Sequence, residues 1–203
     1  LLLIRKFMSE KYNAALGAFE KIKNIDGPLN IGIGTGSTTD IFTENFLPKL
    51  RENISSVYSS SIRTTNLLKA LDFTVEEGKP NKMLDLYIDG ADEVDKNLNL
   101  IKGGGGAHTN EKMIAASSNQ FICIVDTSKL VEILGKFPLP VEALSENKES
   151  VIQACKKYSH QILYYNDKNH LYPAVDLKSQ EHRIFHSQSG NDHPKIGLLV
   201  LVL

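Results

Sequence analysis

The sequence of 203 residues lacks several features that mark particular classes of protein. Its only cysteines are Cys123 and Cys155, and no Cys/His group has the spacing of a zinc site. Basic residues number 23 and acidic residues 24, so no excess positive charge suits nucleic acid or an anionic membrane. No apolar run is long enough to cross a bilayer. We therefore expect a globular, cytoplasmic protein without metal, nucleic-acid or membrane partners.

Short apolar runs and helical patterns alternate along the first two thirds of the chain. The apolar runs predict strands at residues 29–33, 54–60, 84–89 and 120–125, with a further extended segment at 97–102. Apolar residues at helical spacing predict helices at 5–23, 62–71 and 108–118, and another directly after the first strand. Such alternation is typical of an α/β fold, here a Rossmann-like, doubly wound and mostly parallel sheet.

Two prolines, Pro138 and Pro140, interrupt this pattern. Proline is disfavoured in central strands and in helix interiors, so this segment indicates an exit from the first domain. We therefore predict a first domain over residues 1–136 and a smaller, more polar domain over residues 137–203.

Polar motifs follow the predicted strands. Because ligands bind at the carboxyl ends of the strands in an open α/β sheet, we expect these motifs to converge on one edge. The motifs are GTGST (34–38), DGADEVD (89–95), KGGGGA (102–107) and DTSK (126–129).

Two of these motifs are rich in glycine. The GTGST segment suits an anion or sugar hydroxyls at a helix N-terminus, or it is an ordinary turn from strand to helix. It does not match a dinucleotide fingerprint, because Thr39 stands at the third glycine position. The run Gly103–Gly106 is either a flexible connector or a backbone that approaches a ligand closely.

The charged residues of these motifs also permit more than one interpretation. The acids of DGADEVD lack the spacing of a calcium loop, so they form a solvated turn or place one or two aspartates against sugar hydroxyls; we favour the second. Glu111 lies in the first turn of a predicted helix, where the helix dipole favours an acid. Lys102 and Lys129 are the cations nearest the expected site, although most lysines are simply solvated.

The sequence resembles the type A family of ribose-5-phosphate isomerases in three stretches. These are IGIGTGSTT, DLYIDGADEVDKNLNLIKGGGGAHTNEKMIAA and FICIVDTSKLVEILGKFPLPVE, which anchor residues 31 to about 142. The resemblance implies interconversion of ribose 5-phosphate and ribulose 5-phosphate through an enediolate, with no metal or organic cofactor. It also implies a smaller α+β second domain and a homodimer or homotetramer.

The resemblance assigns roles to individual residues. Glu111 is the implied base, Asp89 is our candidate for opening the sugar ring, and Lys102 is a candidate to stabilise the enediolate. The implied substrate-binding residues are Thr35, Gly36, Ser37, Thr38, Asp89, Gly90, Ala91, Asp92, Lys102, Gly103, Gly104, Gly105 and Lys129. The phosphate is held by Lys129 or by the GTGST loop. His108 and Asn110 stand where the family often has an apolar residue and an arginine.

Two other functions fit parts of the pattern. A non-enzymatic sugar-phosphate sensor needs the binding loops but no base, and Glu111 favours the enzyme instead. A nicotinamide-dependent dehydrogenase is disfavoured by the incomplete glycine fingerprint. The C-terminal KIGLLVLVL, residues 195–203, is predicted to dock as a strand in the second domain or in the main sheet; alternatively it is the cut or altered end of a longer chain.

Overall fold

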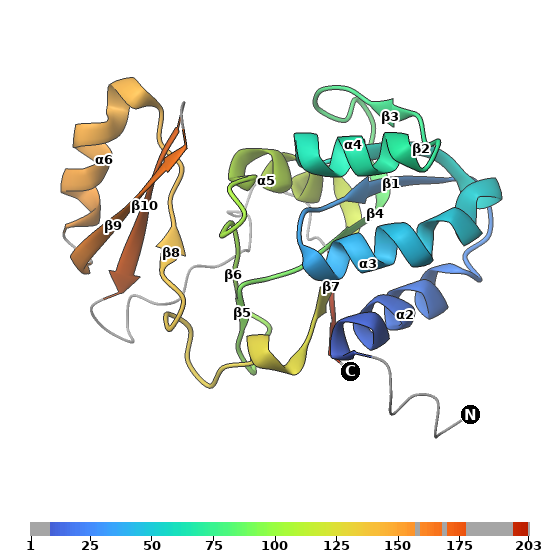
Figure 1. Ribbon diagram of the computed structural model, residues 1–203, viewed down its shortest axis with the longest axis horizontal. Coiled ribbons are helices and arrows are strands. Elements are labelled where there is room, and N and C mark those ends of the chain that lie inside the picture. Colours follow the sequence, from blue (N-terminus) through green and yellow to red (C-terminus); the bar gives the residue numbers. More distant parts are fainter. Residues whose placement is uncertain (1–8, 157–158, 168–169, 178–196, 203) are drawn as a thin grey trace. The chain divides into compact units, whose positions relative to one another are not determined.

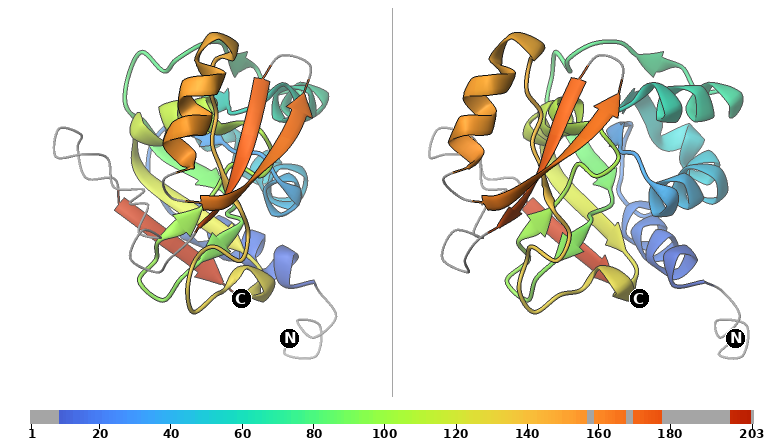
Figure 2. Two further views of the ribbon diagram at one scale, coloured as in Figure 1. Left: turned by 90° about the vertical axis from the view of Figure 1, so that its left-hand side faces the viewer. Right: turned by 60° about the vertical axis from the view of Figure 1, so that its left-hand side comes forward.

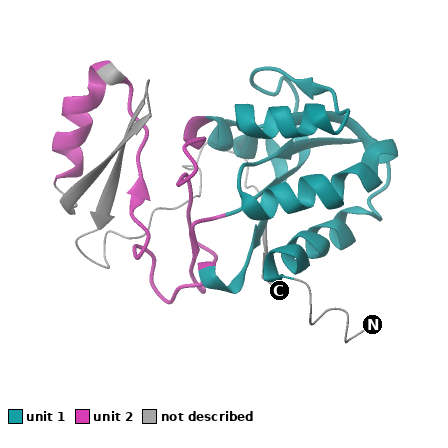
Figure 3. Ribbon diagram, viewed as in Figure 1, with its two compact units in different colours: residues 1–90, 110–128, 189–203 teal, residues 91–109, 129–188 magenta. Residues whose placement is uncertain are grey.

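The computed structural model describes residues 9–156, 159–167, 170–177 and 197–202 (Figure 1). The chain forms two compact units (Figure 3). Unit 1 comprises residues 1–90, 110–128 and 189–203, and unit 2 comprises residues 91–109 and 129–188. The expected boundary lies at 136/137. The division differs from it in three places: residues 91–109 and 129–136 belong to unit 2, and residues 189–203 return to unit 1. The first exit follows β4 (Leu84–Asp89).

Unit 1 contains a six-stranded sheet in the order β11-β7-β4-β1-β2-β3, and all neighbouring strands are parallel. The mostly parallel α/β fold predicted from the alternating pattern is therefore confirmed. The strands are β1 (Leu29–Ile33), β2 (Ile54–Ser59), β3 (Val75–Glu76), β4 (Leu84–Asp89), β7 (Ser118–Val125) and β11 (Gly197–Val202).

Helices cover both faces of this sheet. The helices are α2 (Glu10–Ile22), α3 (Ser37–Asn45), α4 (Ile62–Ala70) and α5 (His108–Ala116), with a 3₁₀ segment at Leu47–Asn53. Serine hydroxyls cap the N-termini of α2 and α4. The Ser9 hydroxyl accepts a hydrogen bond from the Tyr12 amide, and the Ser61 hydroxyl accepts one from the Thr64 amide. Helices α2 and α3 pack on one face, whereas Ile114 of α5 lies over Gly32 on the other.

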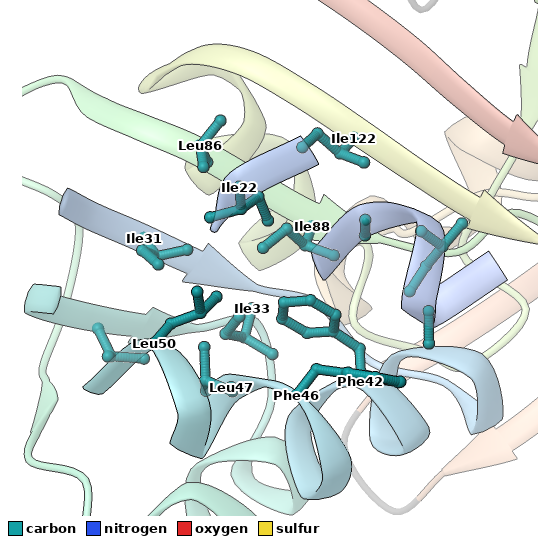
Figure 4. Close-up of a cluster of buried hydrophobic side chains, with 14 of the residues drawn as sticks. Ile22, Ile31, Ile33, Phe42, Phe46, Leu47, Leu50, Leu86, Ile88 and Ile122 are labelled. Atoms are coloured by element: carbon teal, nitrogen blue, oxygen red, sulfur yellow. The ribbon is translucent and has the colours of Figure 1, made fainter. Parts of the chain in front are cut away.

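The main core lies between the sheet and helices α2 and α3 (Figure 4). Ile31 and Ile33 of β1 and Ile88 of β4 point into it, and all three are fully buried. Phe42 of α3 and Phe46, the C-cap residue that follows α3, close it from the helix side. Because alternate residues of a strand face opposite sides, Gly32 and Gly34 belong to the other face of β1.

Unit 2 contains two small antiparallel sheets. The first pairs β5 (Glu93–Val94) with β6 (Leu100–Ile101), and the second has the order β8-β10-β9. The strands of the second are β8 (Leu139–Pro140), β9 (Ser159–Asp167) and β10 (His170–Leu177), and α6 (Lys148–Cys155) contacts β9 and β10.

The C-terminal apolar segment docks in the main sheet. Strand β11 pairs in parallel with β7, from Gly197 opposite Gln120 to Val202 opposite Val125 (Figure 2). The predicted docking as a strand is therefore confirmed, and the structure selects the main sheet from the two locations considered. A continuous aliphatic strand suits the position beside β7, whose Phe121–Val125 segment is buried.

One part of the predicted convergence on the main sheet is wrong. The segments after β1, β4 and β7 do lie at the carboxyl ends of neighbouring parallel strands. The run before the glycines, however, forms only the two-residue strand β6, which pairs with β5 in unit 2 and not with the main sheet. The KGGGGA motif thus follows a hairpin strand, and the parallel-sheet rule does not place it.

Candidate active site

The end of β1 lies directly against the end of β4. Gly34 is buried, and a methyl group on its Cα would lie 1.9 Å from Cγ of Asp89. The Gly34 amide also donates to the Ile88 carbonyl at 2.8 Å. Glycine is therefore required at this position because the Asp89 side chain already occupies the space of a β-carbon.

The Asp89 carboxylate is fully buried and accepts several hydrogen bonds. Its Oδ1 accepts from the amides of Thr35, at 3.0 Å, and Gly90, at 2.7 Å. Its Oδ2 accepts from the hydroxyl of Tyr87 at 2.6 Å. These donors stabilise a charge that burial alone would penalise, and they fasten the GTGST loop to the end of β4.

A cluster of hydroxyls surrounds Thr35. Its Oγ1 lies 2.8 Å from Oγ of Ser60, 2.7 Å from Oγ of Ser61 and 3.1 Å from Oγ1 of Thr64. Thr64 also donates to the Gly34 carbonyl at 2.9 Å. The cluster ties the loop after β1 to the end of β2 and to the first turn of α4, so the loop backbone is held from both neighbouring strands.

The remaining predicted residues of the GTGST loop form the start of α3. Gly36 is its N-cap, with a positive φ of 157° and no side-chain cap, and Ser37 and Thr38 follow in the first turn. The ammonium group of Lys11, on α2, lies 2.9 Å from Oγ of Ser37. A helix N-terminus and a lysine together favour an anionic ligand.

Glu111 lies on the side of α5 that faces the sheet. Its side chain is only 6% exposed, and Ile114, one turn later on the same face, is 4% exposed. The β-carbon that glycine lacks at position 32 would lie 2.4 Å from Cγ2 of Ile114. Gly32 thus permits α5 to approach β1 closely enough to bury the Glu111 carboxylate.

Tyr87 is influenced by two buried acids of unit 1, Asp89 and Glu111. Its ring is fully buried and packs against Phe121, with ring centroids 5.2 Å apart. Burial, and then the negative charges of Asp89 and Glu111, raise the pKa of Tyr87 well above its ordinary value. The phenol therefore remains protonated and donates its hydrogen at neutral pH.

In unit 2, the glycine loop is held by Asp92. Oδ2 of Asp92 accepts a hydrogen bond from the Gly104 amide at 2.8 Å, and the Asp92 amide donates to the Ile101 carbonyl at 2.8 Å. The Gly106 amide closes a turn onto the Gly103 carbonyl at 2.9 Å. The loop is an ordered turn, so the flexible-connector interpretation is not supported.

His108 and Glu142 hold the other end of this loop. A β-carbon at Gly103 would lie 2.7 Å from Nδ1 of His108, so the imidazole ring is seated against that glycine. Glu142 accepts hydrogen bonds from the amide, at 2.9 Å, and from the hydroxyl of Thr109, and so caps α5 from a distant part of the chain. Burial lowers the pKa of His108; the carboxylates of Glu142 and Asp92 oppose this effect and the charge of Lys102 adds to it.

The other acids of DGADEVD stabilise turns of unit 2. Glu93 is buried and accepts hydrogen bonds from the amides of Gly135, at 2.7 Å, and Phe137, at 2.5 Å. Asp95 accepts from the amides of Asn97 and Asn99. In the part of the chain that the structure describes, no group of three His, Cys, Asp or Glu side chains is arranged to hold a metal ion.

The remaining predicted residues of unit 2 are Ala91, Lys102, Gly105 and Lys129. Lys102 and Lys129 are both partly buried, and Lys129 ends a short 3₁₀ turn, Thr127–Lys129. Gly105 is exposed, and no other heavy atom lies within 4 Å of where its β-carbon would be. An accessible backbone at this position can be approached closely by a ligand.

Within unit 1, the structure brings Thr35, Asp89 and Gly90 together by direct hydrogen bonds, and it buries Glu111 beside Tyr87. Within unit 2, it joins Asp92 to Gly104. Sequence reasoning missed Tyr87, Lys11 and the hydroxyls of Ser60 and Thr64. A polar Tyr in the otherwise apolar LYI segment of β4 was the one available signal, because a buried tyrosine usually needs a hydrogen-bond partner.

The chemistry available in unit 1 is that of acids and bases. Two buried carboxylates lie near one protonated phenol, and one of them is on the first turn of a helix. Such groups transfer protons without a metal. None of the described helices is long and apolar enough to span a membrane.

Comparisons with known proteins agree with this chemistry. Residues 56–173 match the family model of ribose 5-phosphate isomerase A (phosphoriboisomerase A). The ribose-5-phosphate isomerase A of Baumannia cicadellinicola is 44% identical over 137 residues, which are 68% of this chain and 60% of that protein. That of Bordetella petrii is 43% identical over 145 residues, 71% of this chain and 64% of that protein. The chain therefore spans a little under two thirds of the length of these relatives.

Solved structures show the same fold. The ribose 5-phosphate isomerase A of Neisseria gonorrhoeae is 37% identical with a TM-score of 0.73, over 83% of this chain and 78% of that one. A D-ribose-5-phosphate isomerase in complex with phospho-erythronic acid is 30% identical with a TM-score of 0.72, over 84% of this chain and 81% of that one. The chain belongs to the ribose-5-phosphate isomerase A family.

Proposed function

We propose that this chain is an aldose–ketose isomerase that interconverts D-ribose 5-phosphate and D-ribulose 5-phosphate, a reaction of the non-oxidative pentose phosphate pathway. The observation that carries the proposal is Glu111, a carboxylate kept out of water in the first turn of α5, at the position where the family resemblance places the base. A sensor domain would gain nothing from burying a carboxylate there, so the non-enzymatic alternative is not favoured.

In this proposal Glu111 removes the proton from C2 of the open-chain aldose and returns it to C1. The intermediate is an enediolate, whose negative oxygen needs hydrogen-bond donors. The amides of Gly103 and Gly105 and the ammonium group of Lys102 are the proposed donors. Asp89 is the proposed group for proton transfer during ring opening, and no metal or organic cofactor takes part.

We assign the phosphate to the start of α3. Gly36, Ser37 and Thr38 provide the first-turn amides and hydroxyls, and Lys11 adds a positive charge 2.9 Å from Oγ of Ser37. Lys129 and the Gly90–Asp92 segment are then proposed to contact the sugar oxygens. A relative is in complex with phospho-erythronic acid, and a phosphorylated, negatively charged ligand of this kind suits the same groups.

A coupled or direct assay with ribose 5-phosphate tests the activity, and Glu111→Gln tests the base. We expect kcat to fall roughly 10²- to 10⁴-fold, because the amide keeps the shape of the side chain but cannot accept the proton. EDTA treatment of the wild-type protein is expected to leave the rate unchanged, since no metal takes part in the proposal.

The matched control is Glu149→Gln. Glu149 is also in the first turn of a helix, α6, but its side chain is exposed. It should retain wild-type kcat, which separates proton transfer from a general effect of charge on a helix dipole. Near wild-type turnover by Glu111→Gln would reject Glu111 as the base.

We also propose that the protein works as a homo-oligomer, a dimer or a tetramer, in the cytoplasm. Leu98, Leu130 and Ile133 of unit 2 are exposed in the isolated chain, as expected for residues that another subunit covers. Cys123 and Cys155 are not joined in a disulfide, which suits a reducing compartment. Light scattering coupled to size-exclusion chromatography measures the subunit number, and a monomer at micromolar concentration would contradict the assembly.

A further inference from the structure

Tyr87 occupies a position prepared for it by the neighbouring strands. In the parallel register, Gly32 of β1 lies opposite both Tyr58 of β2 and Tyr87 of β4, and Tyr87 lies opposite Phe121 of β7. A β-carbon at position 32 would lie 2.9 Å from Cδ2 of Tyr87. The missing side chain of Gly32 therefore leaves room for the tyrosine ring, and a phenylalanine would fill the same space.

The hydroxyl of Tyr87 joins a chain of hydrogen bonds. It donates to Oδ2 of Asp89 at 2.6 Å. Oγ of Ser60 lies 2.8 Å from Oγ1 of Thr35, whose amide donates to Oδ1 of Asp89 at 3.0 Å. The chain of contacts thus runs from Tyr87 through Asp89 and Thr35 to Ser60.

Two negative charges also act on the hydroxyl. The negative charges of Asp89 and Glu111 both raise the pKa of the phenol, and both carboxylates are almost completely buried. A hydroxyl at this depth costs free energy unless it is hydrogen-bonded, and the ring alone would satisfy the packing against Phe121. The hydroxyl group of Tyr87 is explained by the hydrogen bond that it donates to the Asp89 carboxylate.

We infer that Tyr87 is a positioning residue of the isomerase, whose hydroxyl fixes the Asp89 carboxylate and, through it, the relation of the GTGST loop to the buried acids. This inference rests on the proposed function. Tyr87 is not assigned any contact with the substrate; it acts through Asp89, which it holds in one orientation. The loss of its hydroxyl should therefore affect turnover more than substrate binding.

Tyr87→Phe tests the inference, with ribose 5-phosphate as substrate. Hydrogen bonds to charged groups correspond to roughly 10- to 100-fold in a rate constant, and we expect kcat to fall within that range. KM should change by less than about threefold, because the residues that bind the substrate remain. Tyr58→Phe is the matched control: Tyr58 is also buried, lies on the other side of Gly32, and should retain wild-type kcat.

A double-mutant cycle distinguishes positioning from general support of the fold. If Tyr87 acts through Asp89, adding Tyr87→Phe to Asp89→Asn should change the residual kcat by no more than about twofold. Fold losses that multiply in the double variant, or wild-type kcat in Tyr87→Phe, would overturn the inference. A wild-type protein without isomerase activity would instead reject the proposed function itself, and the inference with it.

Discussion

The two glycine-rich segments of the molecule use glycine for different reasons. In the Gly32–Gly36 segment of unit 1, the missing side chains at 32 and 34 make room for Ile114, Tyr87 and Asp89. In the Gly103–Gly106 segment of unit 2, Gly103 and Gly106 have φ angles of 99° and 80°, which other residues rarely adopt. Contacts with neighbouring side chains thus explain glycine at positions 32 and 34, whereas backbone conformation requires it at positions 103 and 106.

Gly105 fits neither explanation. Its φ is not in the left-handed region, and no other heavy atom lies within 4 Å of its missing β-carbon. By contrast, a β-carbon at Gly104 would lie 2.7 Å from Oδ1 of Asp92 and from Cζ of Phe137. Three of the four consecutive glycines are therefore explained within unit 2, and for the fourth we propose that a ligand approaches the backbone there.

Gly34→Ala should produce the largest effect, on stability. The new methyl group would lie 1.9 Å from Cγ of a fully buried Asp89, so the strand or the carboxylate must move. Overpacking of this kind costs roughly 1–3 kcal/mol, and the loss of the Asp89 hydrogen bonds places this variant at the upper end. Chemical denaturation measures the change in the free energy of unfolding.

Gly27→Ala is the matched comparison. Gly27 has a φ of 87° but no atom within 4 Å of its missing β-carbon. Alanine at this position therefore lowers the free energy of unfolding only through backbone conformation, by on the order of 1 kcal/mol. If Gly34→Ala destabilised the protein no more than Gly27→Ala, crowding by Asp89 would not be the reason for glycine at position 34.

Gly105→Ala should leave stability unchanged and reduce activity. Since alanine has the space and the backbone conformation that it needs, the melting temperature should stay within a few degrees of wild type. A methyl group between the amides and the sugar should raise KM or lower kcat by about tenfold, the value of one lost hydrogen bond to a charged oxygen. Wild-type kinetics in this variant would show that no ligand approaches position 105.

The difference between the two segments also explains how much the sequence could predict. The apolar runs at 29–33 and 84–89 are long enough to carry a pattern, and the parallel-sheet rule then places the loops that follow them. The strand before the glycines has only two residues, so it carries no pattern that could assign it to the β5–β6 pair instead of the main sheet.

Site residues outside the motifs were also beyond sequence reasoning. Ser60 is paired with Thr35, 25 positions away, and Lys11 with Ser37, 26 positions away. Serine and lysine are common on solvated surfaces, so neither residue type indicates a functional site by itself. Only the arrangement of the strands and of α2 brings them to the GTGST loop.

The smallest expected effect is the pH dependence of stability that arises from His108 in unit 2. Burial lowers the pKa of His108 below its ordinary value, against the opposing charges of Glu142 and Asp92 and with the help of Lys102. The unfolded chain therefore binds a proton more readily than the folded one, so stability is retained above about pH 6.5 and falls as the pH drops from there towards the folded-state pKa.

His108→Gln removes this group, and the melting temperature of this variant should fall less than that of wild type between pH 7 and pH 5. The effect is small because His108 is only partly buried and its carboxylate neighbours oppose the shift. Parallel curves for the two proteins would mean that the imidazole seated against Gly103 takes up its proton as easily as it does in the unfolded chain.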